Sequence, residues 1–246
     1  MPSAVPYRPP PLQKKADPMT TPIDTPISED ALRQALADGY RRLAELGLNT
    51  GSAGNISCRF DGGALISPSG ADAHGIDAQA IVSITMDGEN RSPGIPSSEW
   101  SMHTAIYRHY PQAMAVVHTH SDACVALSAQ RRPLPAFHYM LAGFGGDGVP
   151  CARYATFGTD ALAQSAVDAL AGHTACLLAN HGMICHAVSI EKAVANAAKL
   201  ETLARQYWMS AQLGAPVVLD AAEMATVRDR YRSYGKARLP RGAGAA

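Results

Sequence analysis

Short apolar runs rich in valine and isoleucine are interspersed with helix-like segments along the chain, and this pattern constrains the fold more than any other feature. The runs occupy residues 55–60, 63–67, 80–86 and 113–120. Asp61-Gly62-Gly63 separates the first two runs, and this sequence is typical of a tight β-hairpin, so the sheet contains antiparallel pairs. We therefore predict an α/β fold of three layers (αβα), in which helices cover both faces of a central mixed, mainly antiparallel β-sheet.

Four segments have the apolar spacing and the end signals of helices. Residues 28–47 place leucines near one helical face, with Ser28 as the N-cap and Gly47 as the end. The segment 97–111 begins with two serines, one of which can serve as the cap. Helices are also expected over 189–214 and about 221–234, and a strand, a tight turn at Gly182 and a second strand over 175–188.

The length and the apolar content fit one large domain with an extension at each end. The chain has 246 residues, of which 47% are hydrophobic, and this is enough to bury a full core. Residues 1–26 hold much of the proline and little periodic pattern. We expect a mobile N-terminal tail over 1–26, the folded domain over 27–236 and a flexible C-terminal end over 237–246.

The composition argues against several functional classes. Lysine and arginine together number 21, as do aspartate and glutamate, so no electrostatic footprint indicates binding to nucleic acid or to an anionic membrane. No apolar run approaches the roughly 20 residues that span a bilayer. The five cysteines are odd in number and contain no Cys-x-x-Cys pair, which argues against a disulfide framework and a thiolate zinc site. We expect a cytoplasmic protein.

Histidines stand at the ends of two apolar runs. His118 and His120 are two apart in an extended segment, so their side chains point to the same side. A lone His-x-His is more often a pair of surface or satisfied histidines, but His181 ends a second apolar run in the same way. Two strand ends could thus assemble a metal site of three nitrogens with an open position. We interpret His103, four residues after Glu99, as half of a local helix pair.

Small, uncharged donors gather in three other places. Ser97, Ser98 and Glu99 stand at the expected start of a helix, where unpaired backbone N–H groups can bind phosphate. The segments "GSAGNIS" (51–57) and "SPSG" (67–70) are neutral turn sequences. Taken singly, such segments are usually ordinary turns.

Seven segments together resemble the class II aldolase/adducin family, and they are most similar to its L-fuculose-1-phosphate aldolase branch. They are, in order, "AGNIS", "ISPSG", "PSSEWSMH", "VVHTHSD", "FHYMLAGFGG", "CARYATFGT" and "ANHGMI". The resemblance covers about residues 28–234. It implies a divalent ion, usually Zn²⁺ with Mn²⁺, Co²⁺ or Fe²⁺ as alternatives, and a phosphate site of backbone N–H groups and neutral side chains. The implied metal ligands are Glu99, His118, His120 and His181, and the implied phosphate-binding residues are Gly54, Asn55, Ser69, Gly70, Ser97 and Ser98.

The resemblance also implies an activity and an assembly. The expected enzyme is a metal-dependent aldehyde-lyase that cleaves a ketose 1-phosphate reversibly to dihydroxyacetone phosphate and a small aldehyde through an enediolate. Glu99 would exchange the proton at C3. Tyr139 would reach into the site of a neighbouring subunit of a homotetramer and handle the proton on the C4 oxygen. Tyr234 would lie on a mobile C-terminal tail that closes over the site.

The aldehyde and several related activities stay open. L-fuculose 1-phosphate and a 5-deoxy- or 5-methylthio-pentulose 1-phosphate are the candidate substrates, and we expect Phe144 near their apolar end. An L-ribulose-5-phosphate 4-epimerase is one alternative, although that branch typically has aspartate at the position of Glu99. A methylthioribulose-1-phosphate dehydratase is another. A non-catalytic, adducin-like interaction module is the third, but such domains have lost metal ligands that are present in this sequence.

Overall fold

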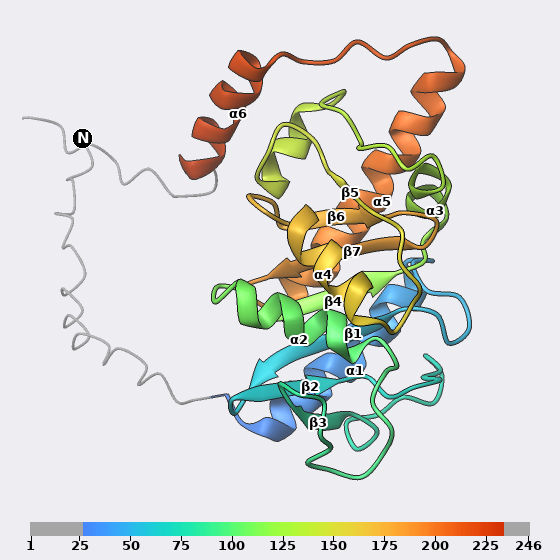
Figure 1. The fold of residues 1–246 in the computed structure, drawn as a ribbon, viewed down its shortest axis with the longest axis vertical. Coiled ribbons are helices and arrows are strands. Elements are labelled where there is room, and N and C mark those ends of the chain that lie inside the picture. The colour runs from blue at the N-terminus through green and yellow to red at the C-terminus, as the bar shows by residue number, and fades with distance from the viewer. Residues whose placement is uncertain (1–26, 234–246) are drawn as a thin grey trace, which may run out of the picture.

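The computed structural model describes residues 27–233. The expected tails over 1–26 and 237–246 lie outside the described residues, as do Tyr234 and the last residues of the expected domain. Within the described range, strands and helices are interspersed along the chain, as the pattern of apolar runs predicted (Figure 1). In this part of the chain, no helix is both long and apolar enough to cross a membrane.

A seven-stranded sheet forms the centre of the fold, in the order β3-β2-β1-β4-β7-β6-β5 (Figure 1). Every neighbouring pair is antiparallel except β5 and β6, which are parallel. The predicted mixed, mainly antiparallel sheet is therefore confirmed. The strands are β1 (Asn55–Phe60), β2 (Gly63–Ile66), β3 (Val82–Thr85), β4 (Ala115–Thr119), β5 (Cys151–Ala152), β6 (Ala175–Leu178) and β7 (Gly182–Ala187).

The expected helices form, but the helix expected over 97–111 begins only at Trp100, and its N-cap is Glu99, without a side-chain cap, rather than a serine. The Ser28 hydroxyl accepts the N–H of Ala31 at 3.3 Å, and Gly47 follows the helix with a φ of 70°. The apolar pattern predicted none of four further elements, α3, η1, α4 and β5. Two of these, α3 and β5, are short. The helices are α1 (Glu29–Glu45), α2 (Trp100–His109), α3 (Asp122–Ser128), the 3₁₀ helix η1 (Tyr139–Phe144), α4 (Asp160–Ala169), α5 (Ile190–Gln212) and α6 (Ala221–Ser233).

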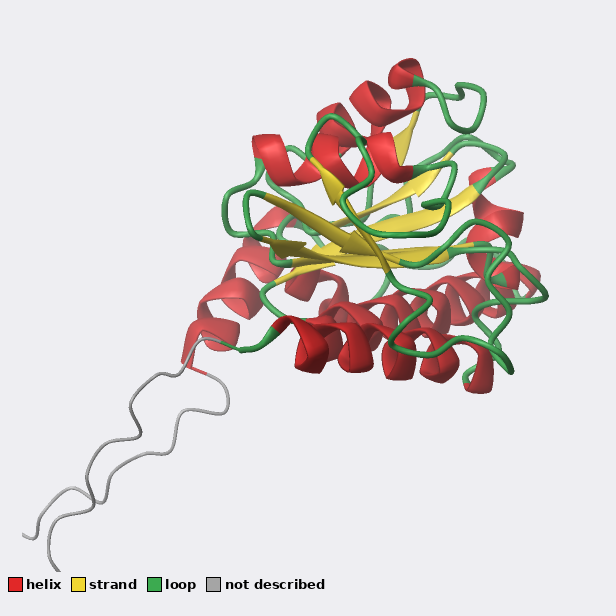
Figure 2. Ribbon diagram, turned by 90° about the horizontal axis from the view of Figure 1, so that it is seen from below, coloured by secondary structure: helices red, strands yellow, loops and turns green. Residues whose placement is uncertain are grey.

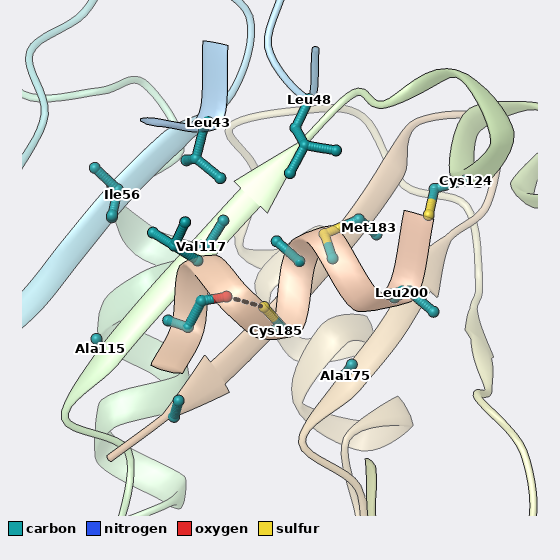
Figure 3. Packing of buried hydrophobic residues seen from close by; sticks show 14 of the residues in the cluster. Leu43, Leu48, Ile56, Ala115, Val117, Cys124, Ala175, Met183, Cys185 and Leu200 are labelled. Atoms are coloured by element: carbon teal, nitrogen blue, oxygen red, sulfur yellow. Dashed lines mark hydrogen bonds between the residues drawn. The ribbon is translucent and has the colours of Figure 1, made fainter. Parts of the chain in front are cut away.

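Helices cover both faces of the sheet, which confirms the three-layer prediction (Figure 2). Alternate strand residues enter different cores because side chains alternate across a strand. Val117 and Cys185 pack with α1 and α5 on one face, as Figure 3 shows. Val116 and Ile184 pack with α2 and α4 on the other face. The central strands β4 and β7 are therefore buried on both sides, and only their ends are available for a site.

Gly182 has a different role from the turn that the sequence predicted. The turn between β6 and β7 is made by residues 179–181, with Asn180 in the left-handed region at a φ of 54°. Gly182 is already paired with Leu178 in the sheet. A Cβ atom on Gly182 would lie well inside van der Waals contact with the backbone carbonyl oxygen of Thr119. Glycine is needed because β7 passes very close to the end of β4.

Replacing Gly182 with alanine should lower the free energy of unfolding by about 1–3 kcal/mol, because two paired strands must move apart. Urea unfolding measures this loss. Gly75→Ala is the matched control, since its Cβ would meet no atom within 4 Å, and we expect it to change stability little. A Gly182→Ala protein as stable as the wild type would contradict the close-approach argument.

Candidate metal centre

Four side chains from three places in the sequence meet at one edge of the sheet. His118 and His120 lie at the end of β4, His181 lies in the turn before β7, and Glu99 stands at the N-cap of α2. Their ligand atoms all lie within 4.8 Å of one another. The three imidazole centroids are 4.7–4.8 Å apart in each pair. We call these four side chains the donor cluster.

A hydrogen bond behind the cluster sets the tautomer of His118. Its Nδ1 lies 2.8 Å from the carbonyl oxygen of Met183, so Nδ1 carries the proton and donates it. The Nε2 atom of His118 is then left with a lone pair directed into the cluster. It lies 2.9 Å from His120 Nε2 and 3.1 Å from Glu99 Oε2.

The segment that follows these histidines is anchored by the neighbouring helix α5. Glu201 of α5 is buried, and its carboxylate accepts the backbone N–H groups of Ala123 and Cys124 at 2.9 and 3.0 Å. These two residues lie in the first turn of α3, which begins two residues after His120. The chain is therefore fixed on both sides of His118 and His120: before them by the sheet and after them by the Glu201 carboxylate.

The donor cluster fits a divalent cation. Glu99 Oε1 is buried and has no hydrogen-bond partner, although His181 Nε2 lies 3.3 Å away. A buried carboxylate oxygen without a partner is costly unless a cation binds it. Three imidazole nitrogens and one carboxylate are donors that zinc and similar ions prefer. The residues present therefore suit a bound metal ion.

The electrostatics of the cluster favour the protonation states that ligands need. Burial opposes the charge on Glu99, but the imidazoles of His118 and His181 and the amide of Asn55 together lower the pKa of Glu99 well below its usual value. Burial, assisted by the neighbouring His118, lowers the pKa of both His120 and His181 to about 4. At neutral pH the carboxylate is ionised and these two imidazoles are neutral.

A cavity of about 370 Å³ opens beside the donor cluster, and Glu99, His120 and His181 form part of its wall. The six residues that the resemblance assigned to phosphate all line it, and we call them the cradle. No lysine or arginine is among the described residues of its lining. The cradle consists of Gly54, Asn55, Ser69, Gly70, Ser97 and Ser98.

Two aromatic residues of the cavity wall had no role in our sequence reasoning. Tyr154 and Phe157 are both largely exposed, and they line the cavity together with Asn180. They belong to the segment "CARYATFGT", which carried the resemblance. Their position just after the short strand β5 was the missing signal, because β5 itself was not predicted.

Three other expected site residues lie elsewhere. Tyr139 is 52% exposed at the start of η1, is not in the lining of the cavity, and stacks on His138 with ring centroids 4.8 Å apart. The expectation for Phe144 is wrong: its side chain is fully buried in the core beside Lys199 and cannot contact a substrate. Tyr234 lies outside the described residues.

His103 is fully buried and takes part in a wider network than a local helix pair. Its Nε2 lies 2.5 Å from Asn55 Oδ1, and its Nδ1 lies 2.7 Å from Ser57 Oγ. The Asn55 amide nitrogen lies 3.0 Å from Glu99 Oε2. Asn55 therefore bridges the two helix residues that we expected to pair.

Complete burial, with a smaller effect of His118, lowers the pKa of His103 to about 3. Because an unfolded histidine titrates near 6.5, acid favours the unfolded chain: this contribution to stability is complete above pH 6.5 and is lost as the pH falls towards 3. Between pH 7 and 5 the loss from this group should be about 2 kcal/mol. Urea unfolding of the wild type and of His103→Gln measures it, and equal losses in both proteins would contradict the prediction.

Comparisons with known proteins agree with this architecture. Residues 34–208 match the class II aldolase and adducin N-terminal domain. The chain is 45% identical over 216 residues to a 5-methylthioribulose-1-phosphate/5-deoxyribulose-1-phosphate aldolase from Rhodospirillum rubrum, a match that covers 87% of this chain and 98% of the relative. It is 40% identical over 210 residues to the L-fuculose phosphate aldolase of Escherichia coli K12, covering 85% of this chain and 98% of that protein. A solved structure of L-fuculose 1-phosphate aldolase superposes with a TM-score of 0.78 at 36% identity, covering 82% of this chain and 96% of that one.

Proposed function

Because this chain belongs to the class II aldolase and adducin family, we propose that it is a metal-dependent aldehyde-lyase that cleaves a ketose 1-phosphate reversibly to dihydroxyacetone phosphate and a small aldehyde. The observation that carries this proposal is the direct contact between the donor cluster and the cradle within one cavity. A site of this kind can hold a phosphate at one end and a polarised carbonyl group at the other.

The cradle suits a phosphate monoester without any charged side chain. Small residues leave the backbone accessible, and the hydroxyl groups of Ser69 and Ser98 can donate hydrogen bonds. The cavity also lies at the N-terminal end of α2, where the helix dipole favours an anion. The absence of lysine from the described lining also favours a mechanism without a Schiff base.

We propose that the donor cluster holds Zn²⁺, with Mn²⁺, Co²⁺ or Fe²⁺ as alternatives. When the C3–C4 bond breaks, negative charge develops at C3 and spreads to the C2 oxygen, and the ion would stabilise this charge as a Lewis acid. Glu99 is ionised and lines the cavity, so it can exchange the proton at C3. One carboxylate thus serves both as ligand and as base.

The proton on the C4 oxygen requires a second group. We assign it to Tyr139 of a neighbouring subunit in a homotetramer, in keeping with its exposed ring outside the cavity of its own chain. A catalytic role of Tyr234 and the domain limits 27–236 also belong to this proposal. The five free cysteines favour a cytoplasmic location.

The proposed substrates share an apolar group at the end remote from the phosphate. They are L-fuculose 1-phosphate and the 5-deoxy- and 5-methylthio-pentulose 1-phosphates. The exposed rings of Tyr154 and Phe157 in the cavity wall are compatible with such a methyl or methylthio group.

Metal analysis and a coupled assay test the proposal. The purified full-length chain should contain about one divalent ion per subunit. With at least one of the three sugars it should release dihydroxyacetone phosphate, which glycerol-3-phosphate dehydrogenase reduces with consumption of NADH. Bound metal without this product from any of the sugars would favour an epimerase or a dehydratase. A protein with neither metal nor product would be a non-catalytic module.

A further inference from the structure

Five buried polar side chains form a continuous chain between α2 and β1, behind the cavity. Glu99, His103 and Tyr107 are spaced four apart and therefore share one face of α2, from its N-cap to its last turn. Asn55 and Ser57 are two apart on the strand and share one face of the sheet. The two sets alternate in space, so that the hydrogen bonds run from Tyr107 through Ser57, His103 and Asn55 to Glu99.

The chemistry of the groups fixes the direction of each bond near Glu99. An ionised carboxylate only accepts, so the Asn55 amide nitrogen must be the donor to Glu99 Oε2. The Asn55 oxygen then faces His103 Nε2, which must carry the proton that it donates. The reverse amide orientation would place the Asn55 oxygen against the carboxylate, two acceptors with no hydrogen between them.

The remaining bonds complete a single directed chain. A neutral His103 that is protonated on Nε2 has an acceptor at Nδ1, to which the Ser57 hydroxyl donates a hydrogen bond, with Oγ and Nδ1 2.7 Å apart. Ser57 Oγ can then accept from the hydroxyl of Tyr107, also at 2.7 Å. Each donor therefore points towards Glu99, and every step uses a fully or nearly fully buried group.

We propose that His103 is a positioning residue for the aldol reaction: it locks the Asn55 amide with its N–H towards Glu99 and so holds the carboxylate in the orientation required for proton exchange at C3. The inference rests on the proposed function. Asn55 also lines the cavity and has a second amide hydrogen, so the same locked amide can donate to a bound phosphate. A phosphate bound in the cradle would therefore help to hold the Glu99 carboxylate in place through Asn55.

Two substitutions of His103 distinguish the effect of its hydrogen bond to Asn55 from the effect of the space that its ring fills. Glutamine can place an amide N–H near the position of Nε2, whereas the shorter asparagine can reach Ser57 but not Asn55. In metal-loaded full-length protein, His103→Asn should lower kcat by about 10- to 100-fold, with metal content nearly unchanged. His103→Gln should recover most of the lost kcat.

Thr104→Val is the matched control. Thr104 is a buried polar residue of the same helix, and its hydroxyl donates to the carbonyl oxygen of Ser101, away from the chain that ends at Glu99. We expect its kcat to stay within about threefold of the wild type. A purely structural role of His103 would instead leave kcat per folded, metal-loaded subunit unchanged in His103→Asn, and that result would overturn the proposal. Equal loss of kcat in the asparagine and glutamine variants would overturn it as well.

A spectroscopic measurement tests the hydrogen bond between His103 and Asn55 without an activity assay. In ¹⁵N-labelled, metal-free protein at pH 7, His103 should show an Nε2–H signal that is protected from solvent exchange, and Asn55→Ala should shift or abolish it. A proton on Nδ1 of His103 would overturn the inference even if His103→Asn failed to fold. If the wild type releases no dihydroxyacetone phosphate while this signal is present, the proposed function fails and the lock itself does not.

Discussion

His118→Ala should lose the bound metal ion and the aldol cleavage together. His118 is the buried centre of the donor cluster: its Nε2 lies close to both His120 and Glu99, and its other nitrogen is held by the Met183 carbonyl. Without it, three donors remain, and the Lewis acid that stabilises the charge at C3 is lost. Because that stabilisation contributes several kcal/mol, we expect kcat/KM to fall by about a thousandfold or more.

Metal content per subunit and the coupled assay on the same sample measure this result. His118→Ala also leaves the Met183 carbonyl without its donor, so a folding defect has to be excluded. His120→Ala provides that check, because His120 is less buried than His118, and its loss should remove metal with little effect on folding. His74→Ala, in an exposed loop, should retain both metal and activity. Full turnover in a metal-free His118→Ala protein would refute the metal-dependent mechanism.

Local sequence patterns predicted the elements whose signals are local. The Asp61-Gly62 turn formed as expected, with positive φ at both residues, and the helix caps at Ser28 and Ser189 accept backbone N–H groups. The histidines at the end of β4 and in the turn before β7 were also predicted as candidate ligands, because side-chain direction in a strand follows a period of two. The short elements α3 and β5 carried too few residues for a periodic pattern.

Contacts that depend on the register between distant segments were not predictable. Gly182 seemed a turn residue because only the folded sheet reveals how near β7 passes to Thr119. Phe144 seemed a substrate contact because its segment is adjacent to Tyr139, yet the 3₁₀ helix turns its ring into the core. The Asn55 bridge between Glu99 and His103 likewise requires the crossing of α2 over β1, which no spacing within either segment defines.

Tyr139→Phe should keep its metal and lose turnover. The substitution removes one hydroxyl from an exposed ring that lies outside the donor cluster, so the ion and the fold are unaffected. If this hydroxyl handles the proton on the C4 oxygen, its removal should lower kcat by about 10²- to 10⁴-fold. Full activity of the metal-loaded variant would overturn the assigned proton role.

Mixing two inactive proteins tests whether that hydroxyl acts across a subunit boundary. In mixed oligomers of Tyr139→Phe and Glu99→Gln, a complete site requires Glu99 from one chain and Tyr139 from its neighbour. Random mixing of equal amounts should therefore restore about a quarter of the wild-type sites, as expected for a head-to-tail interface. The double variant Glu99→Gln/Tyr139→Phe is the control, because mixing it with Tyr139→Phe supplies no tyrosine and should restore nothing. If verified mixed oligomers of the two single variants stay inactive, Tyr139 cannot serve the neighbouring site.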